Sequence, residues 1–139
     1  MPIIVNEDDY PTTLLIVDDN PDIRDLLRLT FSDGNYQLFE AENGSEALDI
    51  ILKEKPDIIL LDIMMPGEID GLAVCDFVKS SMLKRSRIIL LSAKSQQEDF
   101  KKGYEAGADI YVAKPFSPIA LLELVENLKN NIGLADPTP

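Results

Sequence analysis

Histidine is absent from the 139 residues, and cysteine occurs only once, as Cys75. The lack of histidine excludes Ser-His-Asp triads, Cys-His dyads and histidine-ligated zinc sites within this chain. A single cysteine cannot form an internal disulfide, and we expect Cys75 to be a buried helix residue. Any chemistry must therefore come from carboxylates, lysines, hydroxyl groups and a bound ion.

Long apolar runs are also absent, and basic residues are few. The longest apolar run has four residues, for example 58–61, whereas a membrane-spanning helix needs about 18. No signal peptide is predicted after Met1, so we expect a cytoplasmic protein that does not bind membranes. The 13 basic and 25 acidic residues give a net charge of −12, which argues against direct nucleic-acid binding and leaves protein partners and metal cations.

The length and the 45% hydrophobic content are typical of one folded domain. A chain of this size buries roughly two-thirds of its unfolded surface, so it needs no disulfide or metal for stability. Residues 12–130 are expected to form the domain. Residues 1–11 are interpreted as an N-terminal extension, and residues 131–139 as a breaker-rich tail or the start of a linker.

Five short apolar segments alternate with helical patterns. Four of them are continuous runs of Ile, Leu and Val, which is typical of strands buried on both faces of a parallel sheet. These strands are expected at 13–17, 57–61, 87–91 and 109–113, with a weaker one at 36–40. Five strand–helix pairs with short connections predict an α/β fold, a doubly wound parallel sheet flanked by five helices.

Helix start signals lie between these strands. Asn20 followed by Pro21 predicts an N-cap and a proline at the first helical position. Further helices are expected at 45–53, at 71–79, after a capping box formed by Ser95-Gln-Gln-Glu98, and after Ser117-Pro118.

Polar side chains follow four of the strands at their carboxyl ends, where open parallel sheets bind ligands. They are Asp18 and Asp19 after the first strand, Asp62 after the third, Ser92 after the fourth and Lys114 after the fifth. Three neighbouring carboxylates repel one another, so they take up protons or share a cation, for which Mg²⁺ is suited. A carboxylate can also accept a phosphoryl group, whose charge the ion, the lysine and the hydroxyl would stabilise.

Each of these residues has a purely structural explanation when it is taken alone. Asp18 and Asp19 could be loop acids before a helix, and Asp62 could be a turn residue before Pro66-Gly67. Ser92 could be a small residue that ends a strand, and Lys114 a solvated charge. Their joint placement at the strand ends favours a common site.

The chain resembles the receiver domain of bacterial two-component response regulators over about residues 12–130. The resemblance rests on the stretches LLIVDDNPDIRDLL, AENGSEALDIILKEKPDIILLDIMMPG, DGLAVCDFVK, RIILLSAKS and GYEAGADIYVAKPFSPIALLELV. It implies a flavodoxin-like (CheY-like) fold with strand order 2-1-3-4-5. The loop after Asp62 reads MMPGEIDG, one residue longer than the common family form, so its conformation is expected to differ.

The resemblance also implies the roles of individual residues. Asp62 would be the phosphoacceptor. The divalent ion, Mg²⁺ or Mn²⁺, would be held by Asp19 directly, by Asp18 through water, by Asp62, and by the backbone carbonyl of Met64. Residues that bind the phosphoryl group or switch with it would be Ser92 with Ala93, Lys114, and the aromatic Tyr111, and the bond from Lys114 to Pro115 would be cis.

The implied function is that of a signalling phosphoacceptor rather than an enzyme, with at most slow autophosphorylation and self-dephosphorylation. Its partners would be a histidine kinase or a histidine phosphotransfer protein. A downstream protein or an output domain would bind the face of the fourth helix, fifth strand and fifth helix, and phosphorylation could also drive homodimer formation. The chain could be a stand-alone regulator or a receiver cut from a longer regulator or hybrid kinase.

Two other classes share this topology. A phosphatase of the haloacid dehalogenase type needs an acid two residues after its nucleophile, and Met64 at that position cannot donate a proton. A flavodoxin-like electron carrier needs a hydroxyl-rich phosphate loop after the first strand. The acidic Asp18-Asp19-Asn20 would repel that phosphate, so both classes are disfavoured.

Overall fold

The computed structural model describes residues 10–81, 83, 85–94 and 96–132, with the side chains of residues 131 and 132 left out. Most of the expected N-terminal extension and C-terminal tail therefore lies outside the described residues. Within the described part of the chain, no helix is long and apolar enough to cross a membrane.

A single five-stranded parallel sheet forms the centre of the molecule, with the strand order β2-β1-β3-β4-β5 that was predicted. The strands are β1 (Thr12–Val17), β2 (Tyr36–Ala41), β3 (Ile58–Asp62), β4 (Arg87–Ser92) and β5 (Ile110–Ala113). In this register Asp62 lies beside Leu91, and Ser92 lies beside Ala113. The ends of neighbouring strands therefore meet at one edge of the sheet.

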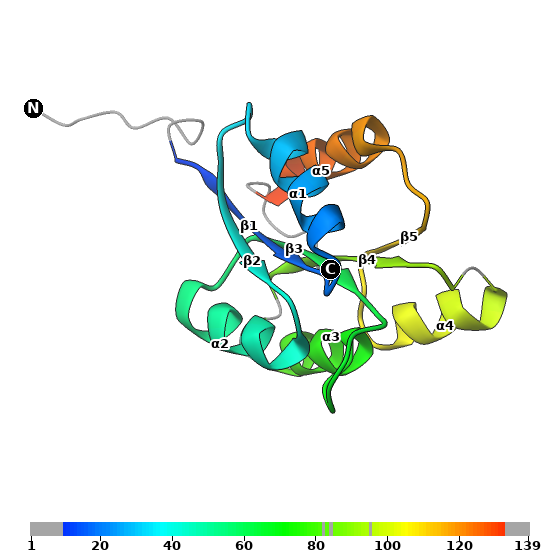
Figure 1. Cartoon of the computed structure of the whole chain (residues 1–139). Coiled ribbons are helices and arrows are strands. Elements are labelled where there is room, and N and C mark those ends of the chain that lie inside the picture. Colours follow the sequence, from blue (N-terminus) through cyan, green and yellow to red (C-terminus); the bar gives the residue numbers. More distant parts are fainter. Residues whose placement is uncertain (1–9, 82, 84, 95, 133–139) are drawn as a thin grey trace, which may run out of the picture.

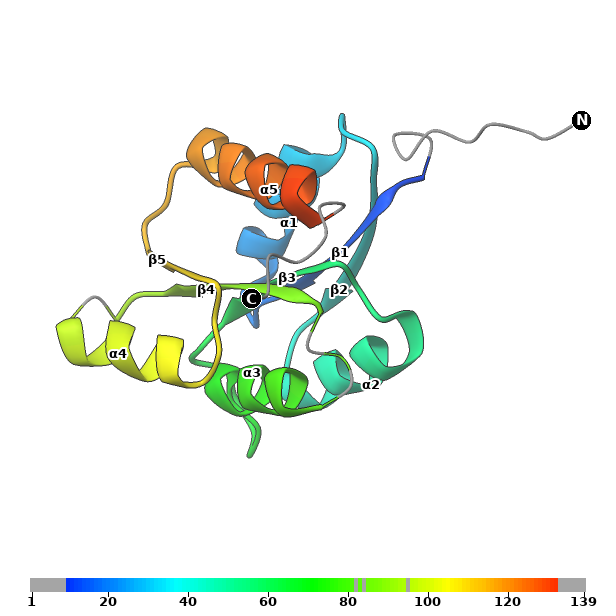
Figure 2. The same ribbon diagram turned by 180° about the vertical axis from the view of Figure 1, so that it is seen from behind.

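Five helices cover the two faces of the sheet. They are α1 (Pro21–Phe31), α2 (Gly44–Glu54), α3 (Gly71–Ser80), α4 (Gln97–Glu105) and α5 (Pro118–Ile132). Figure 1 shows α1 and α5 on one face and α2, α3 and α4 on the other, and Figure 2 gives the same arrangement from behind.

Alternate residues of each strand enter two separate hydrophobic cores, because successive side chains in a strand point to opposite faces. In β1, Leu15 and Val17 belong to the core under α2 and α3, whereas Leu14 and Ile16 belong to the core under α1 and α5. All four side chains are at most 1% exposed. This double burial explains the continuous apolar runs in the sequence.

The helix starts follow the sequence signals closely, with one exception. The side chain of Asn20 accepts a hydrogen bond from the Asp22 N–H at 2.9 Å and caps α1, as predicted. The capping box at 95–98 is wrong by one residue. Gln96 precedes the first turn of α4, and the Asp99 carboxylate accepts from its N–H at 3.1 Å. The consecutive acids Glu98 and Asp99 allow both frames; Ser95 itself lies outside the described residues.

The loop between β3 and α3 projects from the body of the molecule beside α3, in green in Figure 1. Gly67 has a φ of 101° there, a conformation that favours glycine, and no atom lies within 4 Å of the position that a Cβ would take. At the end of the loop, a Cβ on Gly71 would clash with the backbone oxygen of Asp62. The start of α3 therefore packs directly on the end of β3.

Candidate functional site

Three carboxylates meet at the carboxyl edge of the sheet. Asp18 follows β1 directly, Asp19 comes next, and Asp62 is the last residue of β3. One carboxylate oxygen from each lies within 4.8 Å of the other two. Asp18 and Asp62 are 1% and 5% exposed, whereas Asp19 is open to solvent. The structure thus brings together the acids that were predicted to meet.

Lys114 extends from the end of β5 into this acidic cluster. Its Nζ lies 2.8 Å from Asp18 Oδ2 and 3.5 Å from Asp62 Oδ2. Its backbone N–H donates to the Ser92 carbonyl at 2.7 Å, and the peptide bond to Pro115 is cis. One ammonium against three carboxylates leaves two formal negative charges without compensation. Such a site favours bound protons or a cation.

Burial and the neighbouring charges shift the pKa values of Asp62 and Lys114. Burial raises the pKa of the Asp62 carboxyl, and the charge of Asp18 raises it further. Lys114 and the N–H of Met64 oppose these effects only in part. For Lys114, burial lowers the pKa, but the hydrogen bond to Asp18 and the charges of Asp62 and Asp18 outweigh it and raise the pKa overall. Lys114 is therefore a fixed positive charge.

Every polar group of Asp18 has a partner. Its N–H donates to the Ala41 carbonyl at 3.1 Å, and its Oδ1 accepts from the Asn20 N–H at 2.9 Å. Its Oδ2 accepts from Lys114, and its backbone carbonyl accepts from Arg24 Nη1 at 2.6 Å. Sequence reasoning missed Arg24. The available signal was its place on α1, four residues after the N-cap, where a long side chain can reach back to the loop.

The end of β4 turns beside the acids. Ser92 is fully buried, and its Oγ accepts from the Lys94 N–H at 3.1 Å, while Ala93 is exposed. Tyr111 reaches this turn from β5, since its hydroxyl donates to the Lys94 carbonyl at 2.8 Å. Its ring is 8% exposed and packs edge-on against Phe100 of α4, with 4.6 Å between ring centroids.

Met64 borders the acidic cluster on the solvent side. Its backbone N–H donates to Asp62 Oδ1 at 3.2 Å, and its side chain is 56% exposed. An uncharged thioether therefore occupies the position two residues after Asp62, where it offers neither a strong acceptor nor an acid.

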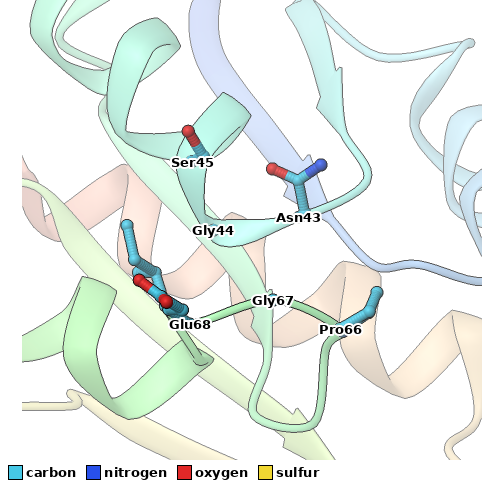
Figure 3. Close-up of a pocket in the computed structure, with 7 residues that line it drawn as sticks. Asn43, Gly44, Ser45, Pro66, Gly67 and Glu68 are labelled. Atoms are coloured by element: carbon cyan, nitrogen blue, oxygen red, sulfur yellow. The ribbon is translucent and has the colours of Figure 1, made fainter.

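A separate cavity of about 480 Å³ lies between the start of α2 and the loop after β3. Figure 3 shows Asn43 and Ser45 on the α2 side and Pro66 and Glu68 on the loop side. The residues that line it are Asn43, Gly44, Ser45, Pro66, Gly67, Glu68 and Ile69, and none belongs to the acidic cluster. The long loop therefore borders a surface cavity beside α2, and Asp62 keeps its contacts with Met64 and Lys114.

The parallel sheet, with three acids and a lysine at its carboxyl edge, agrees with the receiver domain that the sequence resembles. The family model described as "Response regulator receiver domain" matches residues 14–126. The chain belongs to this family, in which receiver domains of two-component systems bind Mg²⁺ through acidic residues and act with histidine kinases. The phosphatase and electron-carrier alternatives are not favoured.

Particular relatives agree with this assignment. The transcriptional regulatory protein ResD of Bacillus subtilis (strain 168) is 47% identical over 107 residues, which are 77% of this chain and 43% of ResD. The chain thus spans less than half the length of that relative.

Solved structures show the same fold. The signal receiver domain of a signal transduction histidine kinase from Syntrophus aciditrophicus is 30% identical, with a TM-score of 0.82 over 92% of this chain and 97% of that one. The chemotaxis protein CheY4 of Vibrio cholerae is also 30% identical, with a TM-score of 0.79 over 86% of this chain and 99% of that one.

Proposed function

We propose that Asp62 accepts a phosphoryl group from a phosphohistidine of a histidine kinase or a histidine phosphotransfer protein. A carboxylate oxygen forms the new bond to phosphorus, the bond from phosphorus to the imidazole nitrogen breaks, and its electron pair returns to the imidazole. The observation that carries this proposal is the position of Asp62, which is buried at a strand end in the acidic cluster with Asp18, 3.5 Å from the Lys114 ammonium. The chain acts as a signalling phosphoacceptor rather than as an enzyme with turnover.

The acidic cluster fits a hard divalent cation. Its donors are all oxygens, and two of its negative charges are without compensation, which suits Mg²⁺ or Mn²⁺. Asp19 and Asp62, with the carbonyl of Met64, would hold the ion directly. Asp18 would act through water, because Lys114 and Asn20 already engage its carboxylate. When bound, the ion would neutralise charge on the phosphoryl oxygens.

Lys114 and Ser92 are placed to stabilise the phosphorylated state. A phosphoryl group adds roughly two negative charges beside Asp18. The Lys114 ammonium, 3.5 Å from Asp62 Oδ2, can move from Asp18 to a phosphoryl oxygen. The Ser92 hydroxyl lies at the end of the neighbouring strand and can donate its proton while its oxygen accepts from Lys94.

The switch would run from Ser92 through the turn with Ala93 and Lys94 to Tyr111. A movement of Ser92 towards the phosphoryl group displaces the turn that Tyr111 holds through the Lys94 carbonyl. In this structure the Tyr111 ring already lies inward, so phosphorylation would stabilise this position rather than create it. The effect is a population shift between two packings, which changes the face formed by α4, β5 and α5.

That face would bind the downstream protein or output domain, or a second copy of the phosphorylated chain. The proposal holds for a stand-alone regulator and for a module of a longer protein. Support for the second form comes from ResD, which is more than twice as long as the matched region, and from the receiver of a histidine kinase. The proposal places the protein in the cytoplasm and assigns it no direct contact with nucleic acid.

The test uses purified protein, Mg²⁺ and acetyl phosphate, with intact mass as the readout. We expect one phosphoryl adduct that requires Mg²⁺ and is missing from Asp62→Asn. The matched control is Asp57→Asn, an acid at the opposite end of the sheet, which should still be labelled. An adduct of equal yield in Asp62→Asn, or one that forms equally well in EDTA, would contradict the proposal.

A further inference from the structure

Arg24 connects helix α1 to the acidic loop. Its Nη1 donates to the backbone carbonyl of Asp18 at 2.6 Å, and its side chain is only 17% exposed. This carbonyl belongs to the peptide group that joins Asp18 to Asp19. The orientation of that peptide sets the direction in which the exposed Asp19 carboxylate leaves the backbone.

Glu40 of β2 holds the other side of the Arg24 guanidinium. Its Oε1 lies 3.5 Å from Arg24 Nε, and its Oε2 lies 2.9 Å from Arg28 Nη1. Arg28 also pairs with Asp25 at 2.7 Å and is itself about half exposed. Arg24 therefore bridges the edge strand and the acidic loop, while Arg28 shares the same glutamate without the contact to Asp18.

We propose that Arg24 is a positioning residue for the cation site, which it builds by fixing the peptide between Asp18 and Asp19. The inference rests on the proposed function, because it concerns the same site. The remaining groups of Asp18 are fixed by Ala41, Asn20 and Lys114, so its carbonyl is the group that Arg24 alone restrains among the described contacts.

Charge and geometry predict opposite effects for the loss of Arg24. Removal of a positive charge near three acids would tighten cation binding, whereas loss of the contact to the loop would weaken it. The charge effect is small because Glu40 already compensates the guanidinium. Removal of a residue that orients metal ligands costs about 10- to 100-fold in affinity. Geometry therefore dominates, and Mg²⁺ affinity should fall about tenfold, at the lower end of that range.

The experiment is calorimetric titration of the full chain with Mg²⁺. Arg24→Ala should weaken binding about tenfold. Arg24→Lys keeps the charge, but a lysine has one ammonium group in place of the planar guanidinium that contacts Asp18 and Glu40 through different nitrogens. This variant should therefore also weaken Mg²⁺ binding. Arg28→Ala is the matched control and should stay within about twofold of the wild type, since Arg28 does not contact the loop.

Two outcomes would overturn the inference. If Arg24→Ala and Arg24→Lys bind Mg²⁺ as tightly as the wild type, the loop is positioned without Arg24. If Arg24→Ala binds Mg²⁺ more tightly than the wild type, the charge of Arg24 outweighs its contact with the loop. Thermal unfolding is measured for each variant, and Arg24→Lys decides the question if Arg24→Ala does not fold. Asp19→Asn distinguishes failure of this inference from failure of the proposed function. If the wild type and Asp19→Asn both lack Mg²⁺ binding, the proposed function fails as well.

Discussion

The hydroxyl of Tyr111 donates a hydrogen bond to the backbone carbonyl of Lys94 at 2.8 Å. This bond ties β5 to the turn that follows β4, two residues after the buried Ser92. The same tyrosine ring packs on Phe100, and its backbone N–H donates to the hydroxyl of Tyr104 at 3.2 Å. Tyr111 therefore contacts both the turn after β4 and helix α4.

The inward position of Tyr111 depends on a glycine in α4. A Cβ at Gly103 would lie 2.7 Å from Cδ2 of Tyr111, which is too close for the ring to stay in place. We expect Gly103→Ala to push Tyr111 outward, so that the protein gains less than the approximately 1 kcal/mol that this substitution usually adds to a helix. Faster nitration of Tyr111 by tetranitromethane, located by peptide mass, is the measurement. Lys101→Ala on the exposed side of α4 is the control and should leave the nitration rate unchanged.

Asp62→Asn should stabilise the metal-free protein at neutral pH. The folded-state pKa of Asp62 is raised by burial and by Asp18, so the folded state binds this proton more tightly than the unfolded state does. The contribution of Asp62 to stability is complete below its unfolded pKa and is lost as pH rises through the folded pKa. An asparagine at this position cannot ionise, so the melting temperature of the variant should exceed that of the wild type at pH 7 in EDTA.

The advantage of Asp62→Asn should shrink as the pH falls towards the ordinary pKa of aspartate. Thermal unfolding across this pH window provides the check. A difference between the two proteins that is constant with pH would mean that Asp62 does not carry the raised pKa.

Lys114→Ala should destabilise the protein more without Mg²⁺ than with it. Removal of the lysine breaks its 2.8 Å hydrogen bond to Asp18 and leaves all three acids without a cation. We expect a loss of about 2 kcal/mol in the free energy of unfolding in EDTA, as for a hydrogen bond between charged groups. Mg²⁺ should recover part of it, because the ion no longer competes with the ammonium for Asp18 and Asp62 and should bind the variant more tightly than the wild type. Urea unfolding with and without Mg²⁺ tests this, with the exposed Lys53→Ala as control. An equal loss in both conditions would contradict it.

The phosphorylated protein should lose its phosphoryl group slowly. Met64 is exposed on the solvent side of Asp62, and its thioether cannot orient an attacking water as an amide or acid could. Lys94, in the turn after Ser92, is exposed as well. General-base help is worth about 100-fold or more, so we expect a half-life on the order of hours. Decay of the adduct after removal of the donor, followed by intact mass, measures it. Met64→Glu should shorten the half-life, and a wild-type half-life of seconds would sink this prediction.

The sequence predicted the central strands well because both of their faces are buried. β2 was weaker as a pattern, since it is an edge strand in which Leu38 and Phe39 remain partly accessible. The strand order came from the family resemblance, because the apolar runs alone do not distinguish one order from another. The α4 capping frame was missed by one residue, since adjacent acids at 98 and 99 satisfy the same pattern.

The acids and the lysine of the site were predictable because strand ends converge at one edge of a parallel sheet. Arg24 was not predictable, since an arginine among acids on an amphipathic helix reads as a surface ion pair. Its contact with the Asp18 carbonyl depends on a side-chain path that periodicity does not encode. The inward ring of Tyr111 was equally hidden, because both ring positions are compatible with the same residue in the same strand.

The two hydrophobic cores are separated by the sheet, and β5 faces both of them from the edge of the sheet, where its one hydrogen-bonded neighbour is β4. Tyr111 packs in the core under α4, while Ile110 and Val112 pack against the core under α5. A displacement of β5 therefore moves side chains in both layers at once and breaks backbone contacts on one side only. Among β1, β3, β4 and β5, whose carboxyl ends carry the residues of the site, β5 lies at the edge of the sheet, so a local change of charge reaches the far layer through β5 with the least disruption of the sheet.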